Sequence, residues 1–347
     1  MSESILPSHE FLHFPPRKSR FYDHFVLSFI RDSRDLAFVD LIFKITFLVL
    51  PFAIFLLIDR AVSAWWILPY YALVGFFLGP YILMLHNTSH RSFFKKKYDW
   101  LNYYIPWILG PFMGQTPETY FGHHVGMHHP ENNMKDDLSS TLAYRRDNIL
   151  DFAKYFFRFL FLSHYDLAKY FLNRKRYKLF TKITVGELSF YLIVFILLFW
   201  NWKAAVLVFI APVIFTRFMM MNGNWAQHAF IDPKDPENSY KNSITCINSL
   251  YNRRCFNDGY HIEHHLKPSA HWTEMPQHFQ QNLSEYTRQD AVVFEKIDYL
   301  QIWIFLMLKK YDSLAKYFVD LRETKRSHSE IVTFLKSRSQ NPVLNYN

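Results

Sequence analysis

Long apolar runs divide the chain into segments that can cross a lipid bilayer and segments that cannot. Four runs are long and apolar enough for a spanning helix, which needs roughly 20 residues. They lie at about 36–58, 64–85, 183–200 and 204–221. The joins Asp59–Ser63 and Asn201–Lys203 are so short that each pair of helices must form a tight hairpin. The pattern predicts an all-α integral membrane protein with four transmembrane helices in two hairpins.

Basic residues decide on which side of the membrane the long connections lie. They cluster before the first run, after the second and before the third, whereas the short joins carry only Arg60 and Lys203. Cytoplasmic connections are enriched in Lys and Arg. We therefore expect both termini and residues 86–182 and 222–347 to be cytoplasmic, in a bacterial inner membrane or in the endoplasmic reticulum.

Two further aromatic segments are interrupted too often to span. Residues 101–122 contain three prolines and three glycines, and residues 149–172 alternate apolar positions with charged ones. We expect both to lie along the membrane interface as amphipathic or re-entrant helices. The predicted organisation is a cytoplasmic N-terminal segment at 1–35, a membrane domain at 36–280 and a cytoplasmic helical segment at 281–347.

Composition and charge narrow the class of protein. Half of the 347 residues are hydrophobic and only two are cysteines, which excludes a disordered or disulfide-stapled chain. The mean hydropathy of −0.09 requires a large hydrophilic part beside the spans. The net charge of +9 fits nucleic acid, anionic lipid or positive cytoplasmic connections, and the topology favours the last. We expect no nucleic-acid partner, and we expect Cys246 and Cys255 to be reduced, ordinary residues.

Ten of the 17 histidines fall in four short groups, all on the predicted cytoplasmic side. These are His86 and His90 in HNTSH, His123, His124, His128 and His129 in HHVGMHH, His228 in NWAQH, and His261, His264 and His265 in HIEHH. A lone histidine is usually structural, but ten gathered near the ends of membrane helices indicate a metal site in a cytoplasmic helical cap. We interpret the other seven, among them His271 and His328, as structural or surface residues.

The spacing within each group sets the geometry. On a helix, positions i, i+3 and i+4 share a face, so His86 can act with His90 and His124 with His128. Adjacent histidines point about 100° apart and could serve two metals. Imidazoles suit iron, copper and zinc, and nine are too many for one zinc, which takes three or four ligands. Two metals with four or five nitrogens each fit the count, and open positions for oxygen favour iron.

These motifs, over roughly residues 36–280, resemble those of the membrane fatty acid desaturase and hydroxylase superfamily. HNTSH looks like its first histidine box, HHVGMHH its second, NWAQH the site of a further histidine and DGYHIEHH its third. The resemblance implies that two irons are bound by nine histidines, and that Asn224 holds an iron-bound water. The nine implied ligands are His86, His90, His124, His128, His129, His228, His261, His264 and His265.

The second box departs from the usual HxxHH pattern, because Val125 stands three residues before His128. The pattern here is HxxxHH, beginning at His124. This spacing is also similar to that of the membrane alkane hydroxylases. Helical spacing favours His124 as the ligand and leaves His123 as a neighbour that supports it. Metal-bound imidazoles usually donate their second N–H to a carboxylate or carbonyl. The candidate acceptors are Glu118, Asp232, Asp258 and Glu263, although each could equally cap a helix or face water.

The resemblance implies an oxidoreductase that uses O2 to desaturate an acyl chain of a lipid, with hydroxylation of an alkyl or acyl chain as the alternative. An alternative from a different class is a membrane protein that binds metal without catalysis. Such a protein would not convert lipid in an O2-dependent reaction. The chain has no flavin fingerprint, no cysteine set for an Fe–S centre and no HPGG haem signature. We therefore expect a separate electron donor of the cytochrome b5, ferredoxin or rubredoxin type.

Overall fold

The computed structural model describes residues 17–59 and 63–340 and is mostly helical. The chain forms two compact units. Unit 2 contains Arg17–Gly126 and Leu162–Met219, and unit 1 contains Met127–Phe161 and the described chain from Met220 onward. His9 and His13, expected to be structural or surface residues, lie outside the described residues.

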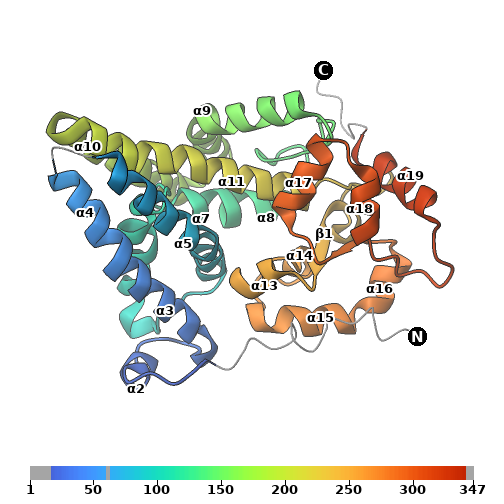
Figure 1. Ribbon diagram of the computed structural model, residues 1–347, viewed down its shortest axis with the longest axis horizontal. Coiled ribbons are helices and arrows are strands. Elements are labelled where there is room, and N and C mark those ends of the chain that lie inside the picture. Colours follow the sequence, from blue (N-terminus) through green and yellow to red (C-terminus); the bar gives the residue numbers. More distant parts are fainter. Residues whose placement is uncertain (1–16, 60–62, 341–347) are drawn as a thin grey trace. The chain divides into compact units, whose positions relative to one another are not determined.

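Unit 2 carries the apolar helices. Its elements in chain order (Figure 1) are α2 (Asp23–Leu27), η1 (Ser33–Asp35), α3 (Leu36–Lys44), η2 (Ile45–Val49), α4 (Leu50–Ile58), α5 (Ala64–His90), η3 (Lys96–Tyr103), η4 (Tyr104–Leu109), α6 (Gly110–Phe112), α7 (Thr119–His123), α10 (Tyr177–Ala205) and η6 (Val206–Ile210). Three elements continue from one unit into the other: η5 (His124–His128), α9 (Ile149–Asn173) and α11 (Ala211–Gln227).

Within the described residues, three helical stretches are long and apolar enough to cross a membrane: Ser33–Ile58, Trp65–His90 and Tyr177–Gln227. The first two match predicted spans, and the third contains both remaining ones. Large apolar side chains on these helices are exposed, including Trp65 at 85% and Phe199 at 79%. That exposure is typical of a lipid-facing surface. The predicted number of four spans stays a prediction.

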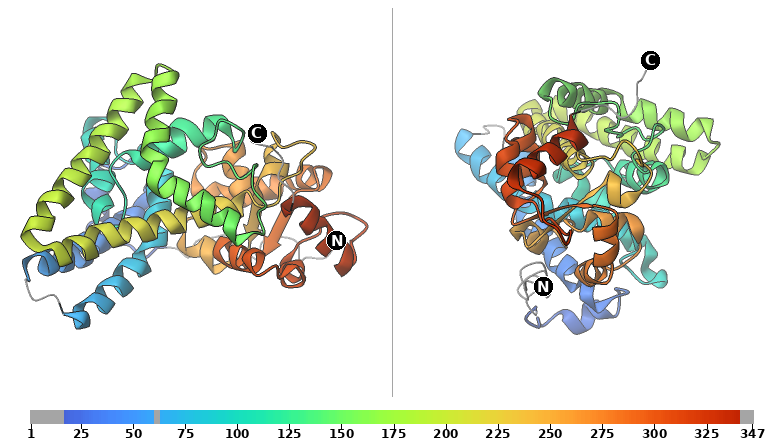
Figure 2. Two further views of the ribbon diagram at one scale, coloured as in Figure 1. Left: turned by 90° about the horizontal axis from the view of Figure 1, so that it is seen from above. Right: turned by 90° about the vertical axis from the view of Figure 1, so that its right-hand side faces the viewer.

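A break at Asn201 divides the long stretch where the sequence predicts a turn. Its backbone is extended (φ −152°, ψ 85°). Figure 2 shows that α10 and α11 run in different directions, as do α9 and α10. The buried Asn201 amide donates to the carbonyls of Leu56, Leu57 and Asp59 at 3.1–3.3 Å. Because the last carbonyls of a helix have no partner within it, this amide caps α4.

The proline- and glycine-rich segment before α7 packs closely on α10 and α11. A Cβ at Gly186 would lie 2.0 Å from the Pro117 carbonyl oxygen, and one at Gly114 would lie 2.3 Å from that of Pro212. Gly114 also has φ +72°, which favours glycine. These close approaches fix the chain that leads to His124.

Unit 1 has short helices and one small sheet. Its elements are α8 (His129–Glu131), α12 (Ser239–Asn242), β1 (Ile244–Ile247), α13 (Leu250–Arg254), α14 (His261–Leu266), η7 (Trp272–Glu274), α15 (Met275–Gln281), α16 (Leu283–Arg288), β2 (Val292–Glu295), α17 (Tyr299–Met307), α18 (Tyr311–Tyr317) and α19 (His328–Ser339). β1 pairs with β2 in parallel, from Ile244 opposite Val292 to Ile247 opposite Glu295. The all-α prediction was therefore wrong in this detail: two apolar four-residue segments bury their backbone polar groups by pairing.

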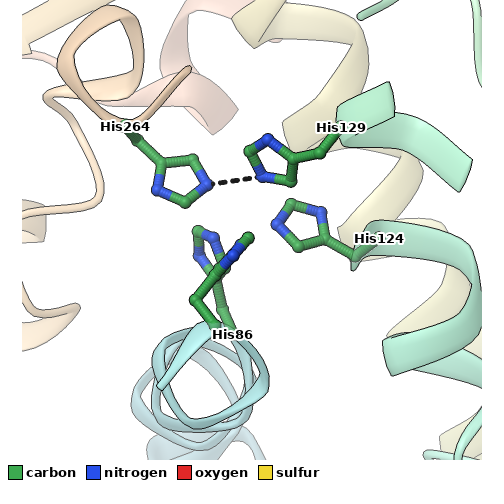
Figure 3. A group of neighbouring side chains, drawn as sticks. His86, His124, His129 and His264 are labelled. Carbon is green, nitrogen blue, oxygen red and sulfur yellow. Dashed lines mark hydrogen bonds between the residues drawn. The ribbon is translucent and has the colours of Figure 1, made fainter. Parts of the chain in front are cut away.

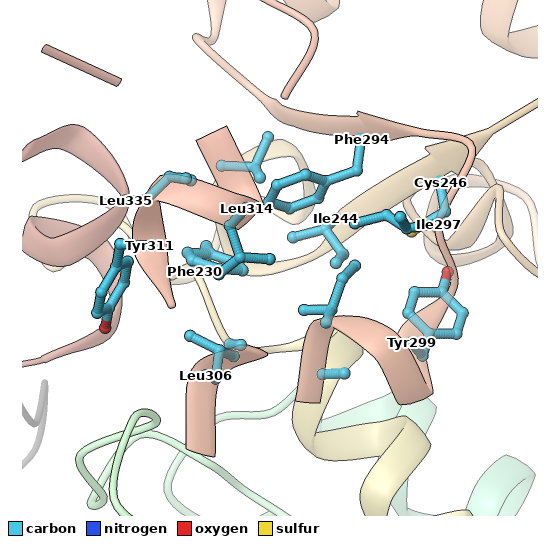
Figure 4. Close-up of a cluster of buried hydrophobic side chains, with 14 residues drawn as sticks. Phe230, Ile244, Cys246, Phe294, Ile297, Tyr299, Leu306, Tyr311, Leu314 and Leu335 are labelled. Carbon is cyan, nitrogen blue, oxygen red and sulfur yellow. The ribbon is translucent and has the colours of Figure 1, made fainter. Parts of the chain in front are cut away.

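The sheet anchors the main hydrophobic cluster of unit 1 (Figure 4). Ile244 and Phe294 from the strands join Leu306, Leu314 and other buried side chains. Ala226, Ala229 and Phe230 belong to the same cluster and flank His228. The packing therefore fixes the end of α11 at the point where a predicted ligand follows.

Candidate metal centres

Four imidazoles converge inside unit 1. His128, His228, His261 and His265 each offer one ring nitrogen, and these atoms lie within 4.8 Å of one another. The Nε2 atom of His261 lies 3.3 Å from that of His228 and 3.0 Å from that of His265. We call this set the tetrad. His261 and His265 are four residues apart on α14, so the helix places them on one face.

Asp137 orients the imidazole of His128. The Nδ1 atom of His128 lies 2.6 Å from Oδ2 of Asp137, and both side chains are almost fully buried. The same carboxylate accepts from the backbone N–H of Asn133 at 2.9 Å, and from the N–H and hydroxyl of Ser139 at 2.8 and 2.7 Å. These donors stabilise an ionised carboxylate, so His128 donates from Nδ1 and presents its Nε2 lone pair.

His228 is oriented in the same way by Asn242. Its Nδ1 atom lies 3.0 Å from the Asn242 carbonyl and 3.1 Å from the side-chain oxygen of Asn242. Burial, with the nearby His128, lowers the pKa of His228 to about 4. Burial, with His261 next in importance, lowers the pKa of His265 well below its usual value. These imidazoles are therefore neutral, the form that binds a metal.

Gly259 brings α14 to its place. A Cβ there would lie 2.2 Å from Oδ1 of Asn252 and 2.5 Å from the Cys246 carbonyl oxygen. Instead, the Gly259 N–H donates to Asn252 at 2.8 Å, and its carbonyl accepts from the Cys246 N–H at 2.7 Å. The turn before HIEHH is thus fastened directly to β1.

The adjacent histidines point to a second set. In unit 1, Nε2 of His129 lies 2.8 Å from Nε2 of His264 (Figure 3). We call His129 and His264 the pair. His129 follows His128 and His264 precedes His265, so of each two adjacent histidines one belongs to the tetrad and the other to the pair. The sequence predicts this division.

Unit 2 holds three further predicted ligands, which we call the triad. The ring centroids of His86 and His90, one turn apart at the end of α5, are 5.3 Å apart. The His124 ring lies 4.5 Å from His86 and 5.0 Å from His90 (Figure 3 shows His86 and His124). Two of the three are buried, His86 at 6% and His124 at 9% exposure.

The carboxylates expected to orient histidines contact other groups, and their role in orienting a histidine stays a prediction. Asp137, which the sequence does not mark by any motif, fulfils that role for His128, whereas the four expected carboxylates have other partners. Their partners are Trp107 and Lys182 for Glu118, Asn282 for Glu263, Arg338 for Asp232, and Tyr251 and Gln227 for Asp258.

Three other predicted residues have distinct environments. His123 is half-buried and belongs neither to the tetrad nor to the triad. His271 is buried and caps η7 by accepting from the Thr273 N–H, so it is structural. Asn224 lies one helical turn before His228, and its amide nitrogen donates to the Ser139 carbonyl at 2.9 Å.

The donor sets fit a first-row transition metal. Neutral imidazoles backed by a carboxylate or carbonyl are typical ligands of iron, copper and zinc. Cys246 and Cys255 are free and buried, and burial raises the pKa of both thiols, so neither offers a thiolate. Both sets are therefore suited to divalent ions bound by nitrogen.

The comparisons with known proteins agree with this chemistry. The sequence model of the family Fatty acid desaturase matches residues 63–296, about two thirds of the chain, including all nine histidines of the tetrad, the triad and the pair. No curated protein and no solved structure matches the chain. On the strength of the family match, the chain belongs to the fatty acid desaturase family.

Proposed function

We propose that the protein is a membrane-bound, O2-dependent, non-haem di-iron enzyme that introduces a double bond into a fatty acyl chain of a lipid. The observation that carries this proposal is the tetrad, four converging imidazoles of which two are oriented by Asp137 and Asn242. A buried histidine with a purely structural role needs only its own hydrogen-bond partners and no convergence with other ring nitrogens. Family membership supports a fatty acyl chain as the substrate.

In this proposal the nine predicted histidines bind two irons, one of which is bound by the tetrad. The triad and the pair would supply the other five predicted ligands. Asn224 would hold a water on one iron through its side-chain oxygen.

A di-iron group, when bound, supplies the chemistry that activates O2 and removes hydrogen from an unactivated C–H bond. The chain's own residues prepare the site. Asp137 and Asn242 hold His128 and His228 in the Nδ1–H tautomer, so their Nε2 lone pairs are directed before any metal arrives. The burial of His228 and His261 shields the tetrad from bulk solvent.

For the membrane arrangement, we propose that Tyr177–Gln227 crosses twice, turning at Asn201, which gives four spans with both termini cytoplasmic. The exposed apolar side chains of α4, α5 and α10 support burial in lipid. The histidines would then lie at the cytoplasmic ends of the spans, in a bacterial inner membrane or in the endoplasmic reticulum.

The reaction needs two external electrons, and we propose that a separate acidic carrier of the cytochrome b5, ferredoxin or rubredoxin type supplies them. Arg253 and Arg254, close in sequence to the third histidine box, are exposed and would attract such a carrier. Turnover should then fall as salt rises, because the screening length shortens to about 3 Å at 1 M. Turnover with NAD(P)H and no carrier would contradict a separate donor.

Hydroxylation is the second candidate, favoured by the HxxxHH spacing from His124 to His129. Both reactions begin with removal of one hydrogen and differ in whether the neighbouring hydrogen or a hydroxyl group is transferred next. The placement of the acyl carbon decides between them.

The deciding experiment uses purified, iron-loaded protein with O2, a reduced carrier and acyl lipid, followed by mass spectrometry of the product. A loss of two hydrogens supports desaturation, and a gain of one oxygen supports hydroxylation. No O2-dependent product with any carrier would leave only the non-catalytic metal-binding alternative. His228→Ala should abolish conversion, whereas the exposed His328→Ala, whose imidazole contacts Asp312, should not.

A further inference from the structure

The amide of Asn224 is held in one orientation by two acceptors. Its Nδ2 atom lies 2.9 Å from the Ser139 carbonyl oxygen and 2.7 Å from the Tyr155 hydroxyl oxygen. Both amide N–H bonds are therefore used, and Oδ1 is the polar atom left over. Asn224 lies in the last turn of α11, and His228 follows directly after this helix, with its backbone N–H donating to the Asn224 carbonyl at 3.1 Å. Oδ1 is thus the group that Asn224 can offer beside His228.

Reversing this amide would be unfavourable. It would place Oδ1 against the Ser139 carbonyl oxygen, which donates no hydrogen. The Tyr155 hydroxyl already donates to that same carbonyl at 3.2 Å and accepts from Asn224, so both of its hydrogen-bonding functions are used. Tyr155 is buried at 3% exposure, and its ring lies 5.0 Å from that of Trp225, so it has little freedom to move.

Ser139 connects this arrangement to the tetrad. Its backbone N–H and hydroxyl donate to Asp137, which orients His128, and its carbonyl accepts from Asn224 and Tyr155. One residue in the loop after the second histidine box therefore helps to orient a metal ligand and an amide.

We propose that Tyr155 is a positioning residue that keeps the Asn224 side-chain oxygen, rather than its nitrogen, directed toward the tetrad. An oxygen there accepts a hydrogen bond from a metal-bound water, whereas an NH2 group would oppose it. The inference rests on the proposed function, because it requires a metal in the tetrad.

Tyr155→Phe removes only the hydroxyl and keeps the ring packing. One N–H of the half-buried Asn224 amide then loses its acceptor, and the amide gains freedom to turn. Turnover should fall about tenfold, which corresponds to about 1.4 kcal/mol. The metal content should not change, because all the histidines remain. The matched control is Tyr317→Phe, a half-buried tyrosine on α18 of the same unit.

The test is a double-mutant cycle read by the visible absorption spectrum of the Co2+-loaded protein. Tyr155→Phe should change the spectrum in the natural background and have no effect in an Asn224→Ala background, because Tyr155 acts through Asn224. Equal changes in both backgrounds, or no change in either, would overturn the inference while leaving the metal site intact. Failure of the natural protein to bind Co2+ would overturn the proposed metal site, and with it this inference.

Discussion

Replacing Asp137 with asparagine tests how the tetrad is oriented. The change replaces one oxygen of a carboxylate whose two oxygens each accept two hydrogen bonds. Oδ1 accepts two hydrogen bonds from Ser139, and Oδ2 accepts from Asn133 and His128. Wherever the new NH2 group lies, it faces at least one backbone N–H. Facing Ser139 costs less, because the serine hydroxyl can turn to accept.

The expected losses of stability and metal affinity follow from the NH2 group facing Ser139. One buried backbone N–H, that of Ser139, loses its acceptor, which costs about 1–3 kcal/mol of unfolding free energy. His128 keeps a hydrogen bond, but to a neutral oxygen instead of a carboxylate. Loss of such a supporting group typically lowers metal affinity about 10- to 100-fold. The tetrad should weaken by that factor in Asp137→Asn.

The assay is a competition titration of purified, metal-free protein with Co2+ against a chelator, with thermal unfolding measured in parallel. The matched control is Asp136→Asn, since Asp136 is the adjacent exposed aspartate. Affinity within twofold of the natural protein in Asp137→Asn would refute the claim that this carboxylate orients His128.

Three further predictions concern other parts of the chain. Gly259→Ala should lower the free energy of unfolding by about 1–3 kcal/mol, because the new Cβ would overlap the Cys246 carbonyl; a thermal midpoint unchanged from the natural protein would count against this packing. Because burial raises the pKa of Cys246 and Cys255, neither thiol should react with a thiol reagent at about pH 8 until the protein unfolds, and rapid reaction in the native state would contradict that burial. A cysteine introduced at the exposed Lys203 should be labelled from the outer face and one at the exposed Lys97 from the inner face, and labelling of both from one side would exclude four spans.

The sequence predicts the histidine groupings because they depend on helical spacing. His86 with His90, and His261 with His265, are one turn apart, so local geometry alone aligns them. The turn at Asn201 is likewise a local feature, visible as a polar interruption between two apolar runs.

The groups that orient the histidines depend on contacts distant in sequence, which no local pattern reveals. Asn242 meets His228 only because α12 folds back onto the end of α11. Asp137 lies nine residues after His128 and resembles an ordinary loop aspartate; its one sequence signal is a carboxylate soon after a histidine box. The pairing of β1 with β2 joins segments nearly fifty residues apart, and four-residue apolar runs are too short to identify as strands.

The most direct test of the central claim is the iron content of the purified protein and of two single variants. The account predicts two irons per chain in the natural protein. It predicts about one in His228→Ala, which disables the tetrad, and about one in His86→Ala, which disables the triad. One iron or none in the natural protein, or two irons retained in either variant, would contradict the assignment of these histidines to a di-iron centre.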